Sequence, residues 1–256
     1  MTRALPAFPC PPTFQPVFGA VVDELIHQLK YCFTGLHSLY VAGSVARCQA
    51  VPEQSDLNVT MVVSAPLGGS EQAILNAIIG RVEKQSPQVA AINVTVLTKS
   101  EALDIALIFK WGFWFKHCCV CVFGDDLSSR FGCFEPSWDI GKSMNDDLAL
   151  QLNDYRRKIM ATRIVSQYIG FCRELAKKMI WSCYSLVFHR CAKQALTIEQ
   201  AAQYFLAYYP QHELAIERLF LLVSGKQVPK KAVLFMINDF GQWIVAEFDK
   251  IERKIG

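Results

Sequence analysis

The chain has 256 residues, of which 52% are hydrophobic and 19% are charged. A chain of this length and composition can bury a substantial core and build one large or two modest domains. Its most apolar stretch, residues 102–122, is interrupted by charged side chains, so we predict no membrane span and no membrane partner. The first residues carry closely spaced prolines rather than an apolar signal helix, and we therefore predict a cytoplasmic protein.

Ten cysteines lie mostly in apolar, helix-like or strand-like segments. Disulfide frameworks belong to short secreted chains, so we predict reduced, buried cysteines. One local cluster, His117, Cys118, Cys119 and Cys121, has the residue types of a metal site. On a strand Cys119 and Cys121 would face one side and Cys118 the other, so the three sulfurs could not converge on one ion. We therefore interpret the cluster as small core residues.

The net charge of +3 is unevenly distributed. Residues 1–146 contain 10 Lys and Arg against 13 Asp and Glu, whereas residues 147–256 contain 16 against 10, which gives −3 and +6. A basic half beside a weakly acidic half can form a cleft for a polyanion, and a nucleoside triphosphate is the natural small candidate. Solvated helix faces explain the same asymmetry, and on charge alone that interpretation is preferred.

The first half of the chain predicts an alternation of helices and strands. Apolar residues at helical spacing from Val17 to Cys32 predict an opening amphipathic helix. Short β-branched runs predict strands, the first of which runs into a Gly43-Ser44 turn and a polar loop. The predicted helices are 16–33, 71–83 and 100–112, and the predicted strands are 36–42, 57–63, 91–98 and an apolar strand ending at Phe123. A turn at 124–126 follows, and we interpret its Asp125 and Asp126 as turn residues rather than as a catalytic base.

The second half predicts a helical bundle. Residues 127–145 are rich in Gly, Pro and Ser and predict a loop. We place the domain boundary within it, with an α/β domain at residues 1–141 and a bundle at residues 142–256. Thr197 and Gln200 form a capping-box start, and Pro210 and Gly225 are helix stops. The predicted helices are 146–178, as one helix or two, then 181–192, 197–209, 212–223 and 228–255.

The motif that carries chemistry lies between the first two strands. Gly43-Ser44-Val45-Ala46-Arg47 follows the first strand, and Ser55-Asp56-Leu57-Asn58 opens the second. A Gly-Ser turn lets the backbone approach a triphosphate and offers amide and hydroxyl donors to its oxygens. Alternation along the second strand puts positions 56 and 58 on one face, where two carboxylates would share magnesium ions. This arrangement resembles the signature of the nucleotidyltransferase superfamily.

The chain is similar in particular to the aminoglycoside adenylyltransferases, which pair this domain with a C-terminal bundle. Residues 92–96 resemble the strand that carries the family's third carboxylate, and residues 178–225 run parallel to its bundle. The resemblance implies a mixed α/β sheet with flanking helices, followed by an all-α bundle. It also implies ATP or another nucleoside triphosphate as substrate, with Mg²⁺ as cofactor. The reaction would transfer a nucleoside monophosphate to a hydroxyl of a small-molecule or protein acceptor and release pyrophosphate. AMP is the first candidate for the transferred group.

The departures from the family pattern concern charge. The resemblance implies Asp56, Asn58 and Asn93 as the catalytic set, with Asp56 and Asn58 as metal ligands, so two of three carboxylates are asparagine. An Asn oxygen can hold magnesium. Two unit charges 4 Å apart, however, interact by about 4 kcal/mol at an effective dielectric near 20. We predict weak binding of a single Mg²⁺ ion and impaired transfer; the alternative is a non-catalytic protein that binds a nucleotide or a partner.

Other positions complete the implied nucleotide site. The resemblance assigns nucleotide contacts to Gly43, Ser44 and Arg47, and it places Cys48 where the family usually has glycine. The lysine that reaches the phosphates in the adenylyltransferases falls on Ile198, and Lys193 could replace it if the preceding loop bends.

Alternative interpretations stay open at several of these positions. Asp56 could merely cap a loop, and the two asparagines could be exposed on an edge strand. Aromatic residues from Trp111 to Phe115 interleave with lysines, but we interpret them as a buried corner and expect no nucleic-acid partner.

Overall fold

The computed structural model describes residues 4–9, 13–191 and 193–255. These form two compact units, the first ending at Phe134 and the second beginning at Glu135. The break comes seven residues before the predicted boundary at 141/142. The reason is the helix α6 (Trp138–Ser143), which lies in the segment predicted as a loop and packs on α8 (Val165–Cys191) of the second unit.

A four-stranded mixed sheet forms the centre of the first unit, with the strand order β3–β2–β1–β4. β1 (Leu36–Ala42) pairs antiparallel with both β2 (Leu57–Val63) and β4 (Cys119–Gly124), while β2 and β3 (Ile92–Thr98) are parallel. Three of these strands match the predicted ranges to within one residue. The sheet with its flanking helices, followed by a helical unit, confirms the predicted fold class.

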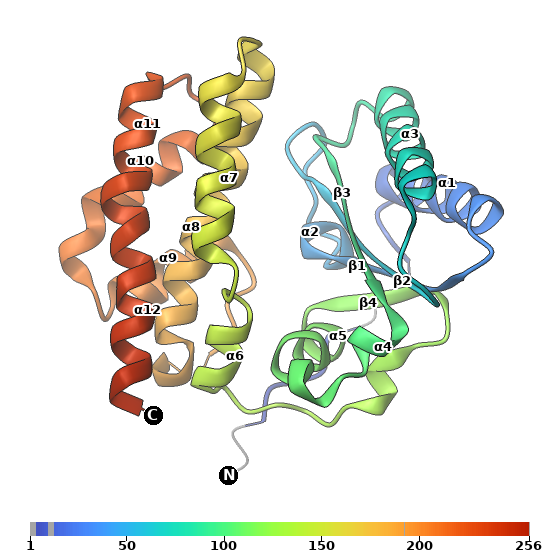
Figure 1. Cartoon of the computed structure of the whole chain (residues 1–256), viewed down its shortest axis with the longest axis horizontal. Helices are drawn as coiled ribbons and strands as arrows, with labels where there is room; N and C mark the ends of the chain where they lie inside the picture. Colours follow the sequence, from blue (N-terminus) through green and yellow to red (C-terminus); the bar gives the residue numbers. More distant parts are fainter. Residues whose placement is uncertain (1–3, 10–12, 192, 256) are drawn as a thin grey trace. The chain divides into compact units, whose positions relative to one another are not determined.

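One face of the sheet is covered by two helices, α1 (Pro16–Cys32) and α3 (Gly69–Gln85), which lie side by side (Figure 1). Leu25 and Leu29 of α1 and Leu75 of α3 join alternate strand residues such as Val59 and Met61 in one core. Val17 and Cys32, at the two ends of the predicted apolar stripe, are exposed. The buried part of the stripe therefore spans the middle turns of α1.

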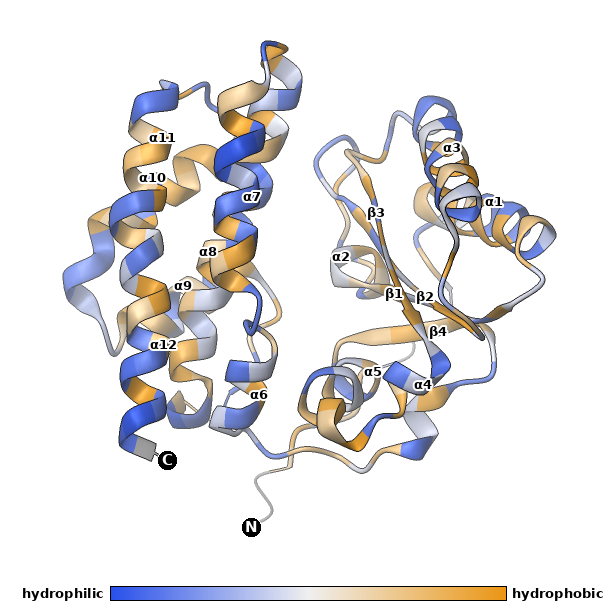
Figure 2. Ribbon diagram, viewed as in Figure 1, coloured by the Kyte–Doolittle hydropathy of each residue, from blue (hydrophilic) through white to orange (hydrophobic). Residues whose placement is uncertain are grey.

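The opposite face of the sheet carries a second, smaller core. Tyr40, Val62 and Leu97 point to this side and pack with Phe115 and Leu127. Because both faces are covered over much of their length, the strands are nearly continuous runs of hydrophobic residues, as the colouring in Figure 2 shows. Buried polar residues on the second face are therefore exceptions that need a partner.

The segment predicted as one helix over residues 100–112 is broken. It consists of α4 (Lys99–Ala102), a 3-10 turn (Ile105–Leu107), a π-helical turn (Ile108–Gly112) and then α5 (Phe113–His117). Asp104 ends the first helix because its carboxylate accepts a hydrogen bond from Ala106 N at 2.9 Å and starts a new turn. The interpretation of the aromatics holds for Phe113 and Phe115, which are buried.

The second unit is a bundle arranged around α8. This 27-residue helix contacts α6, α7 (Leu148–Ala161), α9 (Ile198–Leu206) and α10 (Glu213–Val223), and twelve of its residues are buried. The predicted break near residue 180 is wrong, since no Gly or Pro interrupts the chain there and Met179 and Ile180 are buried. The break lies instead at residues 162–164, which resolves the first bundle segment into two helices.

In the last part of the bundle, the predicted helix cap at Thr197 and the predicted helix stop at Gly225 are present. Thr197 caps α9, with its hydroxyl oxygen accepting a hydrogen bond from Gln200 N at 3.3 Å. Gly225 follows α10 with a φ of +76°, a conformation that favours glycine. The last segment contains α11 (Lys230–Met236), a π-helical turn and α12 (Gln242–Ile255). Within the described ranges no helix has the length and apolar character needed to cross a membrane.

A pair of glycines tests the packing of α6 on α8. A Cβ at Gly141 of α6 would lie 2.6 Å from the backbone oxygen of Ser185, so Gly141→Ala must push the two helices apart. We expect it to lower the free energy of unfolding by about 1–3 kcal/mol. Gly170→Ala, within α8 and with nothing inside 4 Å, should raise it by about 0.5–1 kcal/mol. Urea denaturation of both variants measures the two effects, and equal values would contradict this account of the α6–α8 contact.

Candidate functional site

The turn after β1 is the centre of the candidate site. β1 ends at Ala42, and the single-turn helix α2 (Gly43–Ala46) begins directly after it. Gly43 has a φ of +78°, and a Cβ at this position would lie 3.2 Å from the side-chain nitrogen of Asn58. Both its backbone conformation and its close neighbour therefore favour glycine. Ser44 follows and is half-buried.

The register of the sheet places the two asparagines of the motif together. Asn58 on β2 is opposite Ala42 of β1 and is also in register with Asn93 of β3. The Asn93 side-chain nitrogen donates a hydrogen bond to Asn58 Oδ1 at 3.1 Å. Asn58 is half-buried and Asn93 is exposed. The pair thus lies on the second face of the sheet, beside Gly43, and each asparagine is the other's partner.

Asp56 extends the same face by one position. It precedes β2, and the parallel ladder continues past it, because Leu57 N donates to Ala91 O at 2.8 Å and Ala90 N donates to Ser55 O at 3.0 Å. The backbone is therefore extended from residue 55 to residue 58, and alternation puts Asp56 on the face of Asn58. Asp56 is half-buried.

Arg47 brings positive charge to the end of α2. Its backbone N–H donates to Gly43 O at 3.2 Å, and its half-buried side chain has no ion pair among the residues that the structure describes. Burial lowers the pKa of Arg47, and burial raises the pKa of the neighbouring Cys118 thiol to about 12. Arginine side chains stay protonated in proteins, so Arg47 is a cation despite this lowering. Its Nε is buried without a hydrogen-bond partner in the described part of the chain.

Cys48, at the end of the Gly43 loop, has a left-handed backbone conformation. Its φ is +55°, in the left-handed region that glycine prefers. Cys48 N donates to Val45 O at 3.1 Å, and the thiol donates to Thr13 O at 3.3 Å. The loop therefore holds a non-glycine residue in a conformation that glycine adopts more readily.

Lys193 belongs to the second unit, whereas every residue above belongs to the first. It is exposed, its backbone oxygen accepts a hydrogen bond from the Tyr184 hydroxyl, and its ammonium lies 5.9 Å from the centroid of the Tyr204 ring. Ile198, on which the family lysine falls, is the first residue of α9. A nucleotide contact by Lys193 stays a prediction.

Two threonines that were not predicted as site residues continue the polar face. Thr60 and Thr95 are in register one alternation beyond the asparagine pair. Thr60 is buried and accepts a hydrogen bond from Trp114 Nε1 at 3.0 Å, while Thr95 is exposed. The signal was present in the sequence as the same Asn-x-Thr pattern in both strands.

The residues at the Gly43 turn do not fit a pair of magnesium ions. Such ions are held by several carboxylates, but this face offers one, Asp56, and the oxygen of Asn58 already accepts a hydrogen bond from Asn93. Within residues 4–9, 13–191 and 193–255, no three His, Cys, Asp or Glu side chains form a group that could hold a metal ion.

The His117 cluster has structural partners. His117 is buried in α5, where its Nδ1 contacts Pro6 O at 2.7 Å and its Nε2 accepts a hydrogen bond from Phe134 N at 2.9 Å. Both ring nitrogens are thus engaged with the backbone. Burial raises the pKa values of Cys119 and Cys121. The nine described cysteines are free, but three of them are fully buried, four are half-buried, and Cys32 and Cys133 are exposed. This corrects the prediction of buried cysteines; Cys10 lies outside the described residues.

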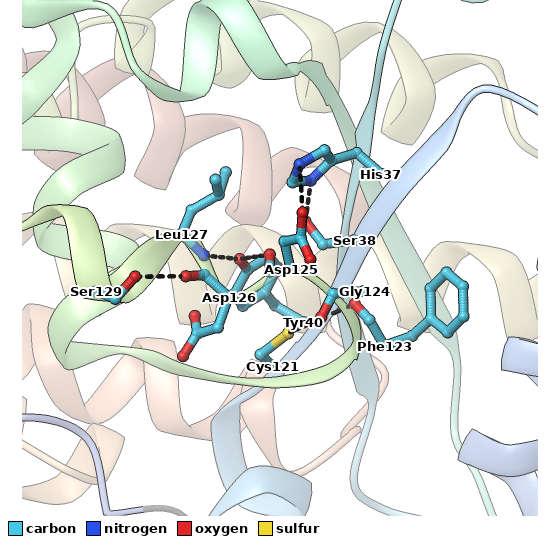
Figure 3. A network of polar contacts seen from close by, with 10 residues as sticks. All are labelled: His37, Ser38, Tyr40, Cys121, Phe123, Gly124, Asp125, Asp126, Leu127 and Ser129. Atoms are coloured by element: carbon cyan, nitrogen blue, oxygen red, sulfur yellow. Dashed lines mark hydrogen bonds and ion pairs between the residues drawn. The ribbon is translucent and has the colours of Figure 1, made fainter.

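At the other end of β1, the residues around Asp125 and Asp126 form a hydrogen-bonded turn (Figure 3). Asp126 accepts a hydrogen bond from Ser128 N at 2.9 Å and caps a 3-10 turn. The Tyr40 hydroxyl donates to Asp125 O at 3.3 Å and accepts from Leu127 N at 2.7 Å. Because Gly124 pairs with Ser38, this turn lies at the start of β1 and Gly43 at its end. Neither aspartate belongs to the candidate site.

Comparisons with known proteins place the fold but not a family. No protein-family model matches the chain, and no curated protein matches it. Among solved structures, the chain is similar to that of spectinomycin adenyltransferase AAD(9) from Enterococcus faecialis with ATP and spectinomycin. The TM-score is 0.59 at 14% sequence identity, over 90% of this chain and 98% of that one. At this identity the likeness shows the nucleotidyltransferase-type fold.

Gly43 and Cys48 both have positive φ, and substitutions at these two positions should change the free energy of unfolding in opposite directions. Cys48→Gly removes the strain of a side chain at positive φ, so we expect the free energy of unfolding to rise by about 1 kcal/mol. Gly43→Ala introduces that strain beside Asn58 and should lower the free energy by at least about 1 kcal/mol. Thermal and urea denaturation measure both changes, and a destabilising Cys48→Gly would show that the thiol contact to Thr13 O outweighs the backbone conformation.

Proposed function

We propose that this chain binds a nucleoside triphosphate, with ATP as the first candidate, at the Gly43 turn, and that it transfers a nucleoside monophosphate to a hydroxyl acceptor slowly or not at all. The acceptor would be a small molecule or a protein. The observation that carries the proposal is the hydrogen bond between Asn93 and Asn58 beside Gly43. The fold supports it, because the similar spectinomycin adenyltransferase structure contains ATP and spectinomycin.

The chemistry of an amide differs from that of a carboxylate in a way that matters for phosphate. A carboxylate only accepts hydrogen bonds, so it can approach a phosphate oxygen only through a bridging cation. An amide also donates. Asn58 and Asn93 therefore put N–H groups where carboxylates would put negative charge, and the Asn58 nitrogen lies next to Gly43. Together with the cation of Arg47, this turn offers donors to a triphosphate directly.

The proposed role of each residue follows from this chemistry. Gly43 lets the backbone turn closely and Ser44 offers a hydroxyl to the phosphates, while Arg47 supplies positive charge. Asp56 is the remaining carboxylate, and we propose that it and Asn58 hold at most one magnesium ion, weakly.

Loss of charge argues against fast transfer. Two opposite unit charges 4 Å apart attract each other by about 4 kcal/mol at an effective dielectric near 20. Each carboxylate that is replaced by an amide removes an attraction of about this size for each unit of charge on the metal ion. Even after allowance for desolvation, a loss of several kcal/mol in the transition state slows a reaction by about three orders of magnitude or more. Nucleotide binding without turnover is the second candidate function. The hydrogen bond between the Asn58 and Asn93 side chains favours it.

The double variant Asn58→Asp plus Asn93→Asp provides the sharpest test. Isothermal titration with ATP should show tighter binding than wild type in Mg²⁺, by about tenfold or more, because two carboxylates would now hold the ion. In EDTA the same variant should bind ATP more weakly than wild type, since the new charges repel the phosphates. Asn76→Asp, the same chemical change at an exposed position of α3, should leave both affinities unchanged.

A pyrophosphate-release assay beside the titration separates the two candidate functions. Binding without release identifies a non-catalytic nucleotide-binding protein. Slow release that Asp56→Ala abolishes identifies an impaired transferase. Absence of binding by wild-type protein for ATP, GTP, CTP and UTP, in Mg²⁺ and in EDTA, would overturn the proposal. An unchanged affinity in the double variant would show that residues 58 and 93 lie outside the nucleotide site.

A further inference from the structure

The positive charge of the second half is concentrated in two segments of the bundle. Residues 155–173 contain five Lys and Arg and no Asp or Glu, and residues 218–238 contain four Lys and Arg and no Asp or Glu. Solvated helix faces normally intersperse the two signs, as Asp154 does by pairing with Arg157 and Lys158 at the edge of the first segment. Two acid-free stretches of this length therefore call for an explanation beyond solubility.

The two segments meet at one end of the bundle (Figure 1). The link between α7 and α8 is joined to the start of α11 by Lys230, whose ammonium donates to Met160 O at 3.3 Å and to Thr162 O. The link before α11 is joined to α8 by the Tyr168 hydroxyl, which donates to Val228 O. These contacts hold the two links against each other.

Between the two links lies a cavity of about 530 Å³. This volume is within the range of about 300–1,000 Å³ typical of small-molecule sites. The wall combines charged side chains with apolar surface and includes Thr162, Arg163, Val165, Tyr168, Val228 and Lys230. It shares no residue with the Gly43 turn, so its assignment is independent of the proposed function.

The charges in this wall are positive and unneutralised. In the described part of the chain neither Arg163 nor Lys230 forms an ion pair, and the partners of the Lys230 ammonium are backbone oxygens and the face of the Tyr168 ring, 5.8 Å from its centroid. Lys230 is thus held in place by groups other than carboxylates among the described residues, and the exposed Arg163 adds a second basic side chain. Val165, Val228 and the Tyr168 ring supply apolar contact between them.

We propose that this cavity is a binding site for a small organic anion, namely a phosphate monoester on an apolar body. Arg163 and Lys230 would contact the phosphate, for which guanidinium and ammonium groups are the usual partners. The apolar body would lie against Val165, Tyr168 and Val228. Such a ligand can come from a soluble metabolite or from the headgroup of an anionic lipid, and both present the same chemistry to the cavity.

Phenyl phosphate is a suitable probe because it joins a phosphate monoester to a ring. We expect titration of the full-length protein, followed by calorimetry or NMR shifts, to show binding tighter than that of inorganic phosphate or benzyl alcohol. Arg163→Glu should weaken the binding by about tenfold, the typical worth of a hydrogen bond to a charged group. Lys231→Glu makes the same change in charge at an exposed neighbour outside the cavity wall and should weaken it by less than about twofold.

If Arg163→Glu and Lys231→Glu weaken the binding of phenyl phosphate equally, the effect comes from the overall charge of the surface and not from the cavity. This result would overturn the proposal. So would binding of phenyl phosphate no tighter than that of inorganic phosphate. Unchanged thermal denaturation of both variants verifies that they fold. Cosedimentation with phosphatidylcholine vesicles containing 20% phosphatidic acid, abolished by Arg163→Glu, assigns the site to a lipid headgroup; phenyl phosphate binding without cosedimentation assigns it to a soluble ligand.

Discussion

The parallel pairing of β2 with β3 is the constraint on which the candidate site depends. Its register puts Asn58 beside Asn93 and Thr60 beside Thr95, and the antiparallel pairing of β2 with β1 puts Asn58 opposite Ala42. Strand side chains alternate between faces, so a slip by one residue would carry Asn58 into the core formed with α1 and α3. The hydrophobic residues that fill that core therefore hold the polar pair in place without contacting a ligand.

Two amide side chains can form a hydrogen bond with each other at these neighbouring strand positions, whereas two ionised carboxylates could not. Ionised carboxylates in register on neighbouring strands repel each other, and such a pair persists only with a bound cation or a raised pKa. Asn58 and Asn93 form a hydrogen bond at 3.1 Å instead. The sheet can thus close at this point in the absence of any ion.

Much of the first unit could be predicted because its signals are local. The strands of the sheet contain short β-branched runs between turn residues, and α1 has apolar residues at helical spacing. The proximity of Asn58 and Asn93 was implied by family resemblance, but their mutual hydrogen bond requires the register, which is a long-range property. Cys48 is similar: its identity was visible as a departure, whereas its left-handed backbone became visible only in the folded loop.

Two failures in the second unit share a physical cause, which is that tertiary packing overrode local sequence, whereas the failure in the segment 100–112 has a local cause. α6 contains Gly141 and follows Pro136, so it resembles a loop, yet the missing Cβ is what allows its close approach to Ser185 of α8. α8 runs through residue 180 because Met179, Ile180 and Cys183 are buried by the helices around it. The break at Asp104 depended on a side chain that competes with the helix for a backbone N–H.

The Gly43 turn and the bundle cavity should respond differently to salt. The attraction of the cavity for anions comes from Arg163 and Lys230 near exposed links, where the Debye length of about 8 Å at physiological ionic strength screens much of the surrounding charge. The donors of the Gly43 turn act at hydrogen-bond distance and include the neutral Asn58 amide, so less of their contribution is screened. For one and the same anion, we therefore expect a proposed contact with Arg163 and Lys230 to weaken more with salt than a proposed contact with the Asn58 amide.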